Sequence, residues 1–185
     1  MKKVDGILED LAKFFFSIFR QNYSENFVKY GLLAGGGGNS MLMNAWIHPS
    51  ASFIRKRISG EAKKRIVDHG YSSLKEIPHS FLRHNAKGSK NRIAAGKQLH
   101  EDHNPSNKKV MQLIMDKVRS YATSNYDEHK DDLMNFLKNV QTLDIITVEQ
   151  DDLRTNKDEI YTKKQKDMFT HQERDDILND TWEYI

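Results

Sequence analysis

The sequence predicts an α+β fold that is predominantly helical, with a small β-hairpin and one helix forming a site embedded among the other helices. Apolar residues at three- and four-residue spacings predict the helices, because this spacing lines up one face of an α-helix. Alternating and β-branched stretches predict the two strands. A capping-box spacing from Thr147 to Gln150 predicts that a helix begins directly after the second strand.

The first helix is predicted within residues 3–30, where the cluster Phe14, Phe15 and Phe16 continues a helical apolar pattern. Its apolar face is broad for a helix at a surface. We therefore expect this helix to lie against the core or against a second copy of the chain. In the second case it is the candidate interface of a homodimer, which an enzyme that cuts palindromic DNA needs.

Four glycines at residues 35–38 interrupt the chain after this helix. Such runs approach phosphates closely in some folds, because their backbone amides are unobstructed. This run lacks the Gly-Lys-Ser/Thr ending of a P-loop and matches no dinucleotide-binding fingerprint. We expect a flexible turn or a closely packed loop, followed by an apolar segment at residues 41–47.

From Ser50 onward the pattern is helical and basic, with Ile54, Ile58 and Ile66 on the apolar side. Residues 55–97 hold twelve Lys and Arg against three acidic residues, a balance of +9, whereas residues 116–185 have a balance of −7. A basic block beside an acidic one indicates a polyanion partner, which we expect to be DNA, with RNA as the alternative. If the block has no partner, it is a set of solvated helix faces. The candidate contacts with nucleic acid are Arg55, Lys56, Arg57, Lys63, Lys64, Arg65, Lys87, Lys90 and Arg92.

Residues 97–105 read KQLHEDHNP and concentrate groups that bind metals or move protons. If residues 98–102 form a strand, its side chains alternate between two faces. His100 and Asp102 then share one face, while Glu101 and His103 point to the other unless the backbone bends. The alternative is a solvated polar turn before the next helix.

The second half of the chain continues with helices predicted at residues 108–121 and 127–140 and a strand at 143–147. A helix follows within residues 147–154. The tail is highly charged, and its last residues, WEYI, are expected to dock back on the body of the protein.

The DHNP motif, the later strand that begins LDIIT and the helix after it resemble the HNH (ββα-metal) nuclease superfamily. The resemblance covers about residues 97–154 and implies a metal ligand at Asp102, a general base at His103 and an orienting residue at Asp144. It also implies a helix ligand at Asp151, where the family more often has His or Asn. His100 is a further candidate ligand, because it shares the strand face of Asp102. Glu149 or Asp152 takes the role of Asp151 if the helix register is shifted.

Two features depart from the family pattern. The helices of residues 108–140 form an insertion between the two strands, and an acidic residue stands on the helix. Two carboxylates favour a hard cation, Mg²⁺ or Mn²⁺, over zinc. In such an enzyme a neutral imidazole deprotonates water, and the cation neutralises charge on the phosphate.

Composition excludes several classes of protein. The chain has no cysteine, which excludes disulfides, zinc–thiolate sites and thiol nucleophiles. It has no run of about 18 apolar residues, so we expect no membrane partner, and the cytoplasm is the default location. We expect a basic helical part at residues 1–96 and a catalytic part at residues 97–185, packed as one compact unit.

These features together predict a divalent-metal-dependent endonuclease that hydrolyses DNA, in the concrete form of a restriction enzyme. The main alternative is a non-catalytic DNA- or RNA-binding regulator in which residues 97–105 are only a polar turn. A third is a structural phage or plasmid protein whose acidic tail binds a partner.

Overall fold

The computed structural model describes residues 2–21, 24, 41–82, 96, 98–156 and 168–185. These residues form seven α-helices and a four-stranded sheet, so the predicted α+β class with mostly helical content is confirmed. The chain divides into two compact units, residues 1–54 with 106–141 and residues 55–105 with 142–185. The boundary predicted at residue 96 therefore falls inside the second unit.

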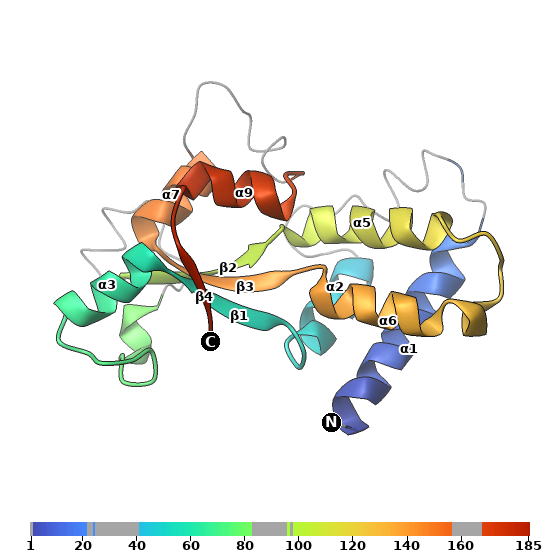
Figure 1. Ribbon diagram of the computed structural model, residues 1–185, viewed down its shortest axis with the longest axis horizontal. Coiled ribbons are helices and arrows are strands. Elements are labelled where there is room, and N and C mark those ends of the chain that lie inside the picture. Colours follow the sequence, from blue (N-terminus) through green and yellow to red (C-terminus); the bar gives the residue numbers. More distant parts are fainter. Residues whose placement is uncertain (1, 22–23, 25–40, 83–95, 97, 157–167) are drawn as a thin grey trace. The chain divides into compact units, whose positions relative to one another are not determined.

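Unit 1 is helical (Figure 1). It contains α1 (Lys2–Phe19), α2 (Met41–Ser50), α5 (Asn107–Arg119) and α6 (Lys130–Asn139), with the short 3-10 helix η4 (Tyr126–Glu128) before α6. The helices predicted at residues 108–121 and 127–140 are thus present, with bounds shifted by a few residues. The glycine run at residues 35–38 lies outside the described residues.

The core of unit 1 is built on the phenylalanines of α1. Phe15 and Phe19 are fully buried and stack with their ring centroids 6.0 Å apart. Trp46 of α2 is also buried, and its indole Nε1 donates a hydrogen bond of 2.8 Å to Gln141. Because these rings fill the interior of their own unit, they do not form the exposed face that a homodimer interface on α1 needs. The alternative expectation, that α1 lies against the core, is confirmed.

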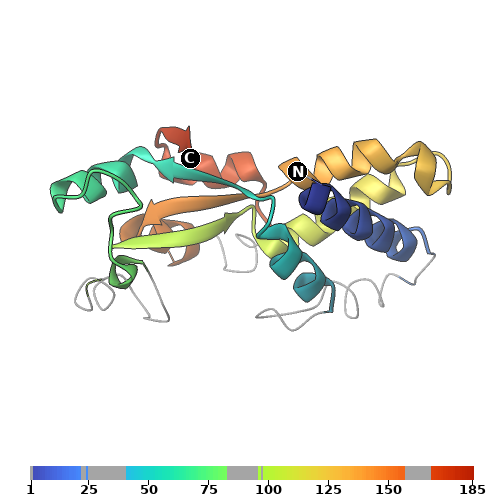
Figure 2. The same cartoon turned by 90° about the horizontal axis from the view of Figure 1, so that it is seen from below.

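Unit 2 contains the sheet, whose strand order is β2-β3-β1-β4 (Figure 2). Strand β3 pairs antiparallel with β2 and parallel with β1, and β4 pairs antiparallel with β1. The strands are β1 (Arg55–Ser59), β2 (Leu99–Asn104), β3 (Thr142–Thr147) and β4 (Trp182–Tyr184). The helices are α3 (Gly60–Asp68), η3 (His79–Phe81), α7 (Val148–Asn156) and α9 (His171–Leu178).

The two faces of this sheet differ in chemistry, because strand side chains alternate. One face is apolar: Ile58, Leu99 and Ile145 pack in one cluster with Ile66 and Phe81. The opposite face carries charged and amide side chains of the three longer strands. Helices α7 and α9 pack against each other beside this polar face, and they are neighbours in Figure 1.

Strand β1 corrects the helical prediction for the segment after Ser50. Residues 55–59 are extended and lie between β3 and β4, and helix α3 begins only at Gly60. Ser59 caps α3, since its Oγ accepts a hydrogen bond of 3.1 Å from the amide of Ala62. The hydrogen bonds that hold β1 as a strand come from residues more than 80 positions away, which local periodicity does not report.

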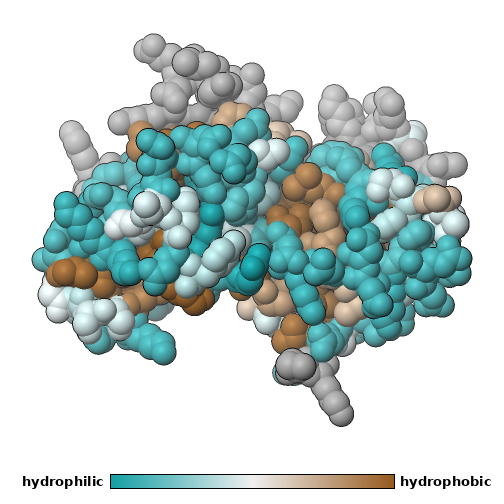
Figure 3. All heavy atoms as spheres, in the orientation of Figure 1, coloured by the Kyte–Doolittle hydropathy of each residue, from teal (hydrophilic) through white to brown (hydrophobic). Residues whose placement is uncertain are grey.

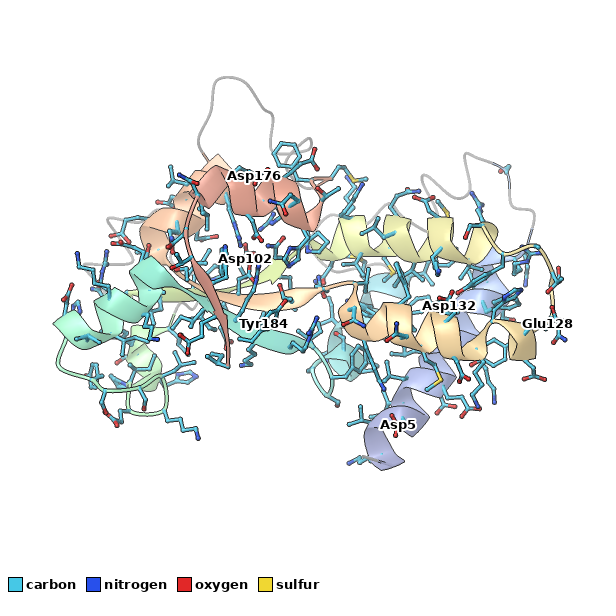
Figure 4. The ribbon with its side chains drawn as sticks, in the orientation of Figure 1. Asp5, Asp102, Glu128, Asp132, Asp176 and Tyr184 are labelled. Carbon is cyan, nitrogen blue, oxygen red and sulfur yellow. The ribbon has the colours of Figure 1, made fainter. Side chains whose placement is uncertain are left out.

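The C-terminal residues dock on the body of unit 2, as predicted. Strand β4 pairs with β1 in the register Arg57 with Tyr184 and Ser59 with Trp182. The guanidinium of Arg57 lies 4.0 Å from the centre of the Trp182 ring. Tyr184 is labelled in Figure 4 at the end of this strand.

The surface seen in Figure 3 is largely hydrophilic, in keeping with a sequence in which 30% of the residues are charged. Among the described residues, every helix is too short or too polar to span a lipid bilayer.

Candidate metal centre

His100, Asp102 and Asp151 converge on the polar face of the sheet. Each offers one ligand atom, and these atoms all lie within 4.8 Å of one another. His100 Nε2 is 3.6 Å from Asp151 Oδ1. Asp151 is 1% exposed, and the side chains of His100 and Asp102 are 17% and 15% exposed, so the group is shielded but open to solvent on the strand side.

The local sequence explains this convergence. His100 and Asp102 are two positions apart on β2, so they share a face. Helix α7 follows β3 without a loop and begins with the predicted capping box: Gln150 N donates to Thr147 Oγ1 at 3.2 Å, and Thr147 N donates to Gln150 Oε1 at 3.0 Å. This start places Asp151 in the first turn of α7, where the helix dipole stabilises a carboxylate.

Two arginines contact Asp102 from the same side. Arg154 Nη1 donates to Asp102 Oδ2 at 3.2 Å, and Arg174 Nη2 donates to the same oxygen. Burial by itself would raise the pKa of Asp102, but the charges of Arg174 and Arg154 outweigh it, so this pKa is lowered. Asp102 is therefore a carboxylate at neutral pH. Figure 4 labels Asp102 on the strand beside α9, the helix that carries Arg174.

Asp144 lies on the same face and is enclosed by hydrogen-bond donors. Arg57 donates from Nε at 2.6 Å and from Nη2 at 2.9 Å, and Arg154 donates from Nη1 at 2.9 Å. Asn104 Nδ2 and Thr142 Oγ1 add bonds of 2.9 and 2.8 Å. Both oxygens of this fully buried carboxylate are thus used in holding the sheet to α7.

Asp175 of α9 completes the network. It accepts from Arg57 Nη1 at 2.8 Å, from Asn104 Nδ2 at 2.9 Å and from Arg154 Nη2 at 3.3 Å. Burial opposes the charged form of Asp175, yet the hydrogen bonds from His171 and Arg57 prevail and hold the pKa of this carboxyl far below its usual range. The pKa of Arg57 is raised: burial opposes its charge, and the bonds to Asp144 and Asp175 outweigh that burial.

The alternation of side chains along β2 separates His103 from this group. His103 stands opposite Leu143, whereas Asp102 stands opposite Asp144. Because directly opposed residues share a face, His103 points to the other face from Asp102 and Asp144. The structure therefore brings together the three predicted ligands. It does not bring His103 next to them, and it does not place Asp144 where it could orient His103.

The predicted nucleic-acid contacts divide into four sets. Arg57 lies inside the ion network, and all three of its guanidinium nitrogens donate to Asp144 and Asp175, so we no longer assign it to a phosphate. Four others lie at or near the surface with partners: Lys56 with Glu101, Lys63 with Glu183, Arg65 with Gln98 and Glu149, and Arg55 over the ring of Tyr184. Lys64 is exposed. Lys87, Lys90 and Arg92 lie outside the described residues.

Sequence reasoning missed the basic side of the site. Arg154 stands three residues after Asp151, a spacing that places both on one side of a helix and is a usable signal. Arg174 and Asp175 lie in the charged tail, where nothing in the sequence distinguishes them from solvated residues. Trp182 was expected to dock, but not against Arg57 and Arg154.

Comparison of the chain with protein-family models, with curated proteins and with solved structures gives no significant match. The class of the site is therefore judged from its own geometry.

Proposed function

We propose that this chain is a divalent-cation-dependent endonuclease that hydrolyses phosphodiester bonds in DNA, with His100, Asp102 and Asp151 holding the cation. One observation carries the proposal: two antiparallel strands and the helix directly after them bring three donor atoms within 4.8 Å of one another. The strand–strand–helix order is the one that the HNH resemblance implies, and the donors come from its first strand and its helix.

The donor set fits a divalent cation. Two carboxylates and one imidazole supply two oxygen ligands and one nitrogen ligand, which suits Mn²⁺ well and Mg²⁺ through the carboxylates. Both arginine contacts of Asp102 are made to Oδ2, so Oδ1 is the oxygen that we assign to the cation. A cation bound there supplies a positive charge that polarises a phosphoryl oxygen and stabilises negative charge on it.

The remaining residues hold this site and its substrate. Asp144, Arg57 and Arg154 fix the strand–helix geometry and are positioning residues in this proposal. We do not assign His103 as the general base in this proposal, because its side chain lies across the strand from the ligands. Arg55, Lys63 and Lys64 are the described cations that we assign to phosphates of the nucleic-acid backbone, where RNA offers the same contacts as DNA.

A restriction enzyme remains the concrete form that we propose, with the cytoplasm as its location. If it cuts palindromic sites, a homodimer is required. Its interface then involves residues other than the buried phenylalanines of α1.

Plasmid cleavage tests the proposed activity. We expect the unsubstituted protein, called the parent below, to nick or linearise supercoiled plasmid in Mn²⁺ or Mg²⁺ and to be inactive in EDTA. Asp151→Asn should lower the cleavage rate by about two to three orders of magnitude, because a weakened Lewis acid removes several kcal/mol of transition-state stabilisation. Its neighbour Asp152, which is not in the ligand group, supplies the control Asp152→Asn, which should cleave at the parental rate. Equal rates for the two variants would refute the site.

A binding protein without catalysis is the second candidate, and one observation favours it. Arg154 and Arg174 already neutralise Asp102, as in a structural ion network. In that case the parent binds duplex DNA with a steep salt dependence. It leaves the DNA intact whatever the cation.

A further inference from the structure

Three arginines lie on the polar face of the sheet, and they differ in how far their donors are used. Arg57 donates from Nε, Nη1 and Nη2 to Asp144 and Asp175. Arg154 also uses all three nitrogens, with Nε donating to the carbonyl of Arg174 and Nη1 and Nη2 to carboxylates. Both guanidinium groups are therefore committed to the network.

Within the part of the chain that the structure describes, the side chain of Arg174 makes one hydrogen bond. Its Nη2 donates to Asp102, and its Nε is buried without a hydrogen-bond partner among the described residues. The side chain is only 6% exposed. A buried N–H of a charged group that lacks an acceptor is unfavourable, so its presence beside a functional group indicates a ligand that completes it.

An unpaired Nε alone does not define a site, because Arg20 of unit 1 has one as well. Arg20 bonds to Tyr121 O and Ser124 Oγ, at 2.9 and 2.8 Å, and both of these partners belong to its own unit. Arg174 instead contacts Asp102, a proposed ligand. This difference makes Arg20 a matched control.

Helix α9 holds the backbone of Arg174 in place. Thr170 and Glu173 form a capping box at its start, with bonds of 3.3 Å from Glu173 N and 2.7 Å from Thr170 N. The next residue, Asp175, is fastened to Arg57 and Arg154. The guanidinium of Arg174 can therefore change partner while its helix stays anchored.

We propose that Arg174 binds a phosphate oxygen of the substrate beside the cation, and that it exchanges its contact with Asp102 for this phosphate. The inference rests on the proposed function. A cation and a guanidinium repel each other and compete for the charge of the same carboxylate. A phosphate between them compensates both charges, and a guanidinium matches phosphate oxygens in shape and hydrogen bonding.

The test measures Mn²⁺ affinity and cleavage in the same variant, Arg174→Gln. Calorimetry with Mn²⁺ alone should show binding that is at least about tenfold tighter than in the parent, because the substitution removes a positive charge that repels the divalent cation and competes for Asp102. Plasmid cleavage at saturating Mn²⁺ should fall about 100-fold, as when one donor to a developing negative charge is removed. If Arg174 were purely structural, its replacement would lower both the Mn²⁺ affinity and the cleavage rate.

Each other result overturns the inference. Mn²⁺ binding that is unchanged or weaker in Arg174→Gln excludes competition for Asp102, and cleavage within about threefold of the parent excludes a phosphate contact. Arg20→Gln should match the parent in both measurements. If Arg174→Gln does not fold, Arg174→Lys is used in its place, because lysine keeps the positive charge. We expect this variant to bind Mn²⁺ with the affinity of the parent and to cleave about tenfold more slowly. Cleavage at the parental rate overturns the inference. A parent that binds no Mn²⁺ refutes the proposed function itself, and this inference with it.

Discussion

Asp102 and Asp144 stand opposite each other on β2 and β3, yet their surroundings give them different roles. Asp144 is fully buried and accepts bonds from two arginines, an asparagine and a threonine. Asp102 shares one oxygen between two arginines and keeps a partly exposed side chain close to His100 and Asp151. The same residue type thus serves as a structural anchor in one strand and as a proposed ligand in the next.

Replacing Asp144 tests the anchoring role. Asp144→Asn removes one negative charge from the buried network and leaves one positive charge unmatched, although Asp175 still pairs with Arg57 and Arg154, so the free energy of unfolding should fall by about 3 kcal/mol. Urea unfolding followed by circular dichroism measures it. Glu101→Gln is the control: it removes the exposed pair with Lys56 and should cost less than about 1 kcal/mol. If Asp144→Asn unfolds at the parental urea concentration, the network does not hold the sheet.

At the scale of elements, the start of α3 is where unit 2 joins its C-terminal strand. Gly60 N donates to Thr181 O at 3.0 Å, and Glu61 N donates to Asp180 Oδ2 at 3.1 Å. A Cβ at Gly60 would collide with Thr181 Oγ1 and would lie 2.9 Å from Asp180 Oδ1. The carboxylate of Asp180 cannot easily move away from this Cβ, because Gln150 and Thr181 also donate hydrogen bonds to it. The glycine therefore permits the close approach that docks β4.

Two glycine substitutions should have opposite effects. Gly60→Ala should lower the free energy of unfolding by about 1–3 kcal/mol, because the added methyl group overpacks the contact with residues 180–181. Gly6→Ala, inside α1 with no atom within 4 Å of the new Cβ, should raise it by about 0.5–1 kcal/mol. Thermal and urea unfolding of both variants measure this difference. Destabilisation of equal size in the two would show that the contact at Gly60 is not responsible.

At the scale of the whole molecule, local pattern predicted the elements that depend on local interactions. Helices α5 and α6, strand β3 and the capping box of α7 were predicted from local pattern, whereas β2 was one of two interpretations beside a polar turn. Strand alternation also placed His100 and Asp102 on one face. Asp151 was assigned through the family resemblance, and the structure brings it to them.

Features that depend on distant pairing were not predictable in this way. Strand β1 has a helix-like apolar pattern and becomes extended only because β3 and β4 pair with it. Arg174 and Asp175 are ordinary charged residues until α9 packs against α7. Their role is visible only in the folded chain.

Calorimetric titration with Mn²⁺ tests the central claim most directly, because it measures the site without requiring a substrate. We expect the parent to bind Mn²⁺ at one site, Asp151→Asn to bind at least about tenfold more weakly, and Asp152→Asn to match the parent, since only Asp151 supplies a ligand atom. Circular dichroism of each variant verifies that it is folded. A parent that takes up no Mn²⁺, or an Asp151→Asn variant that binds it as the parent does, would contradict a metal centre at His100, Asp102 and Asp151.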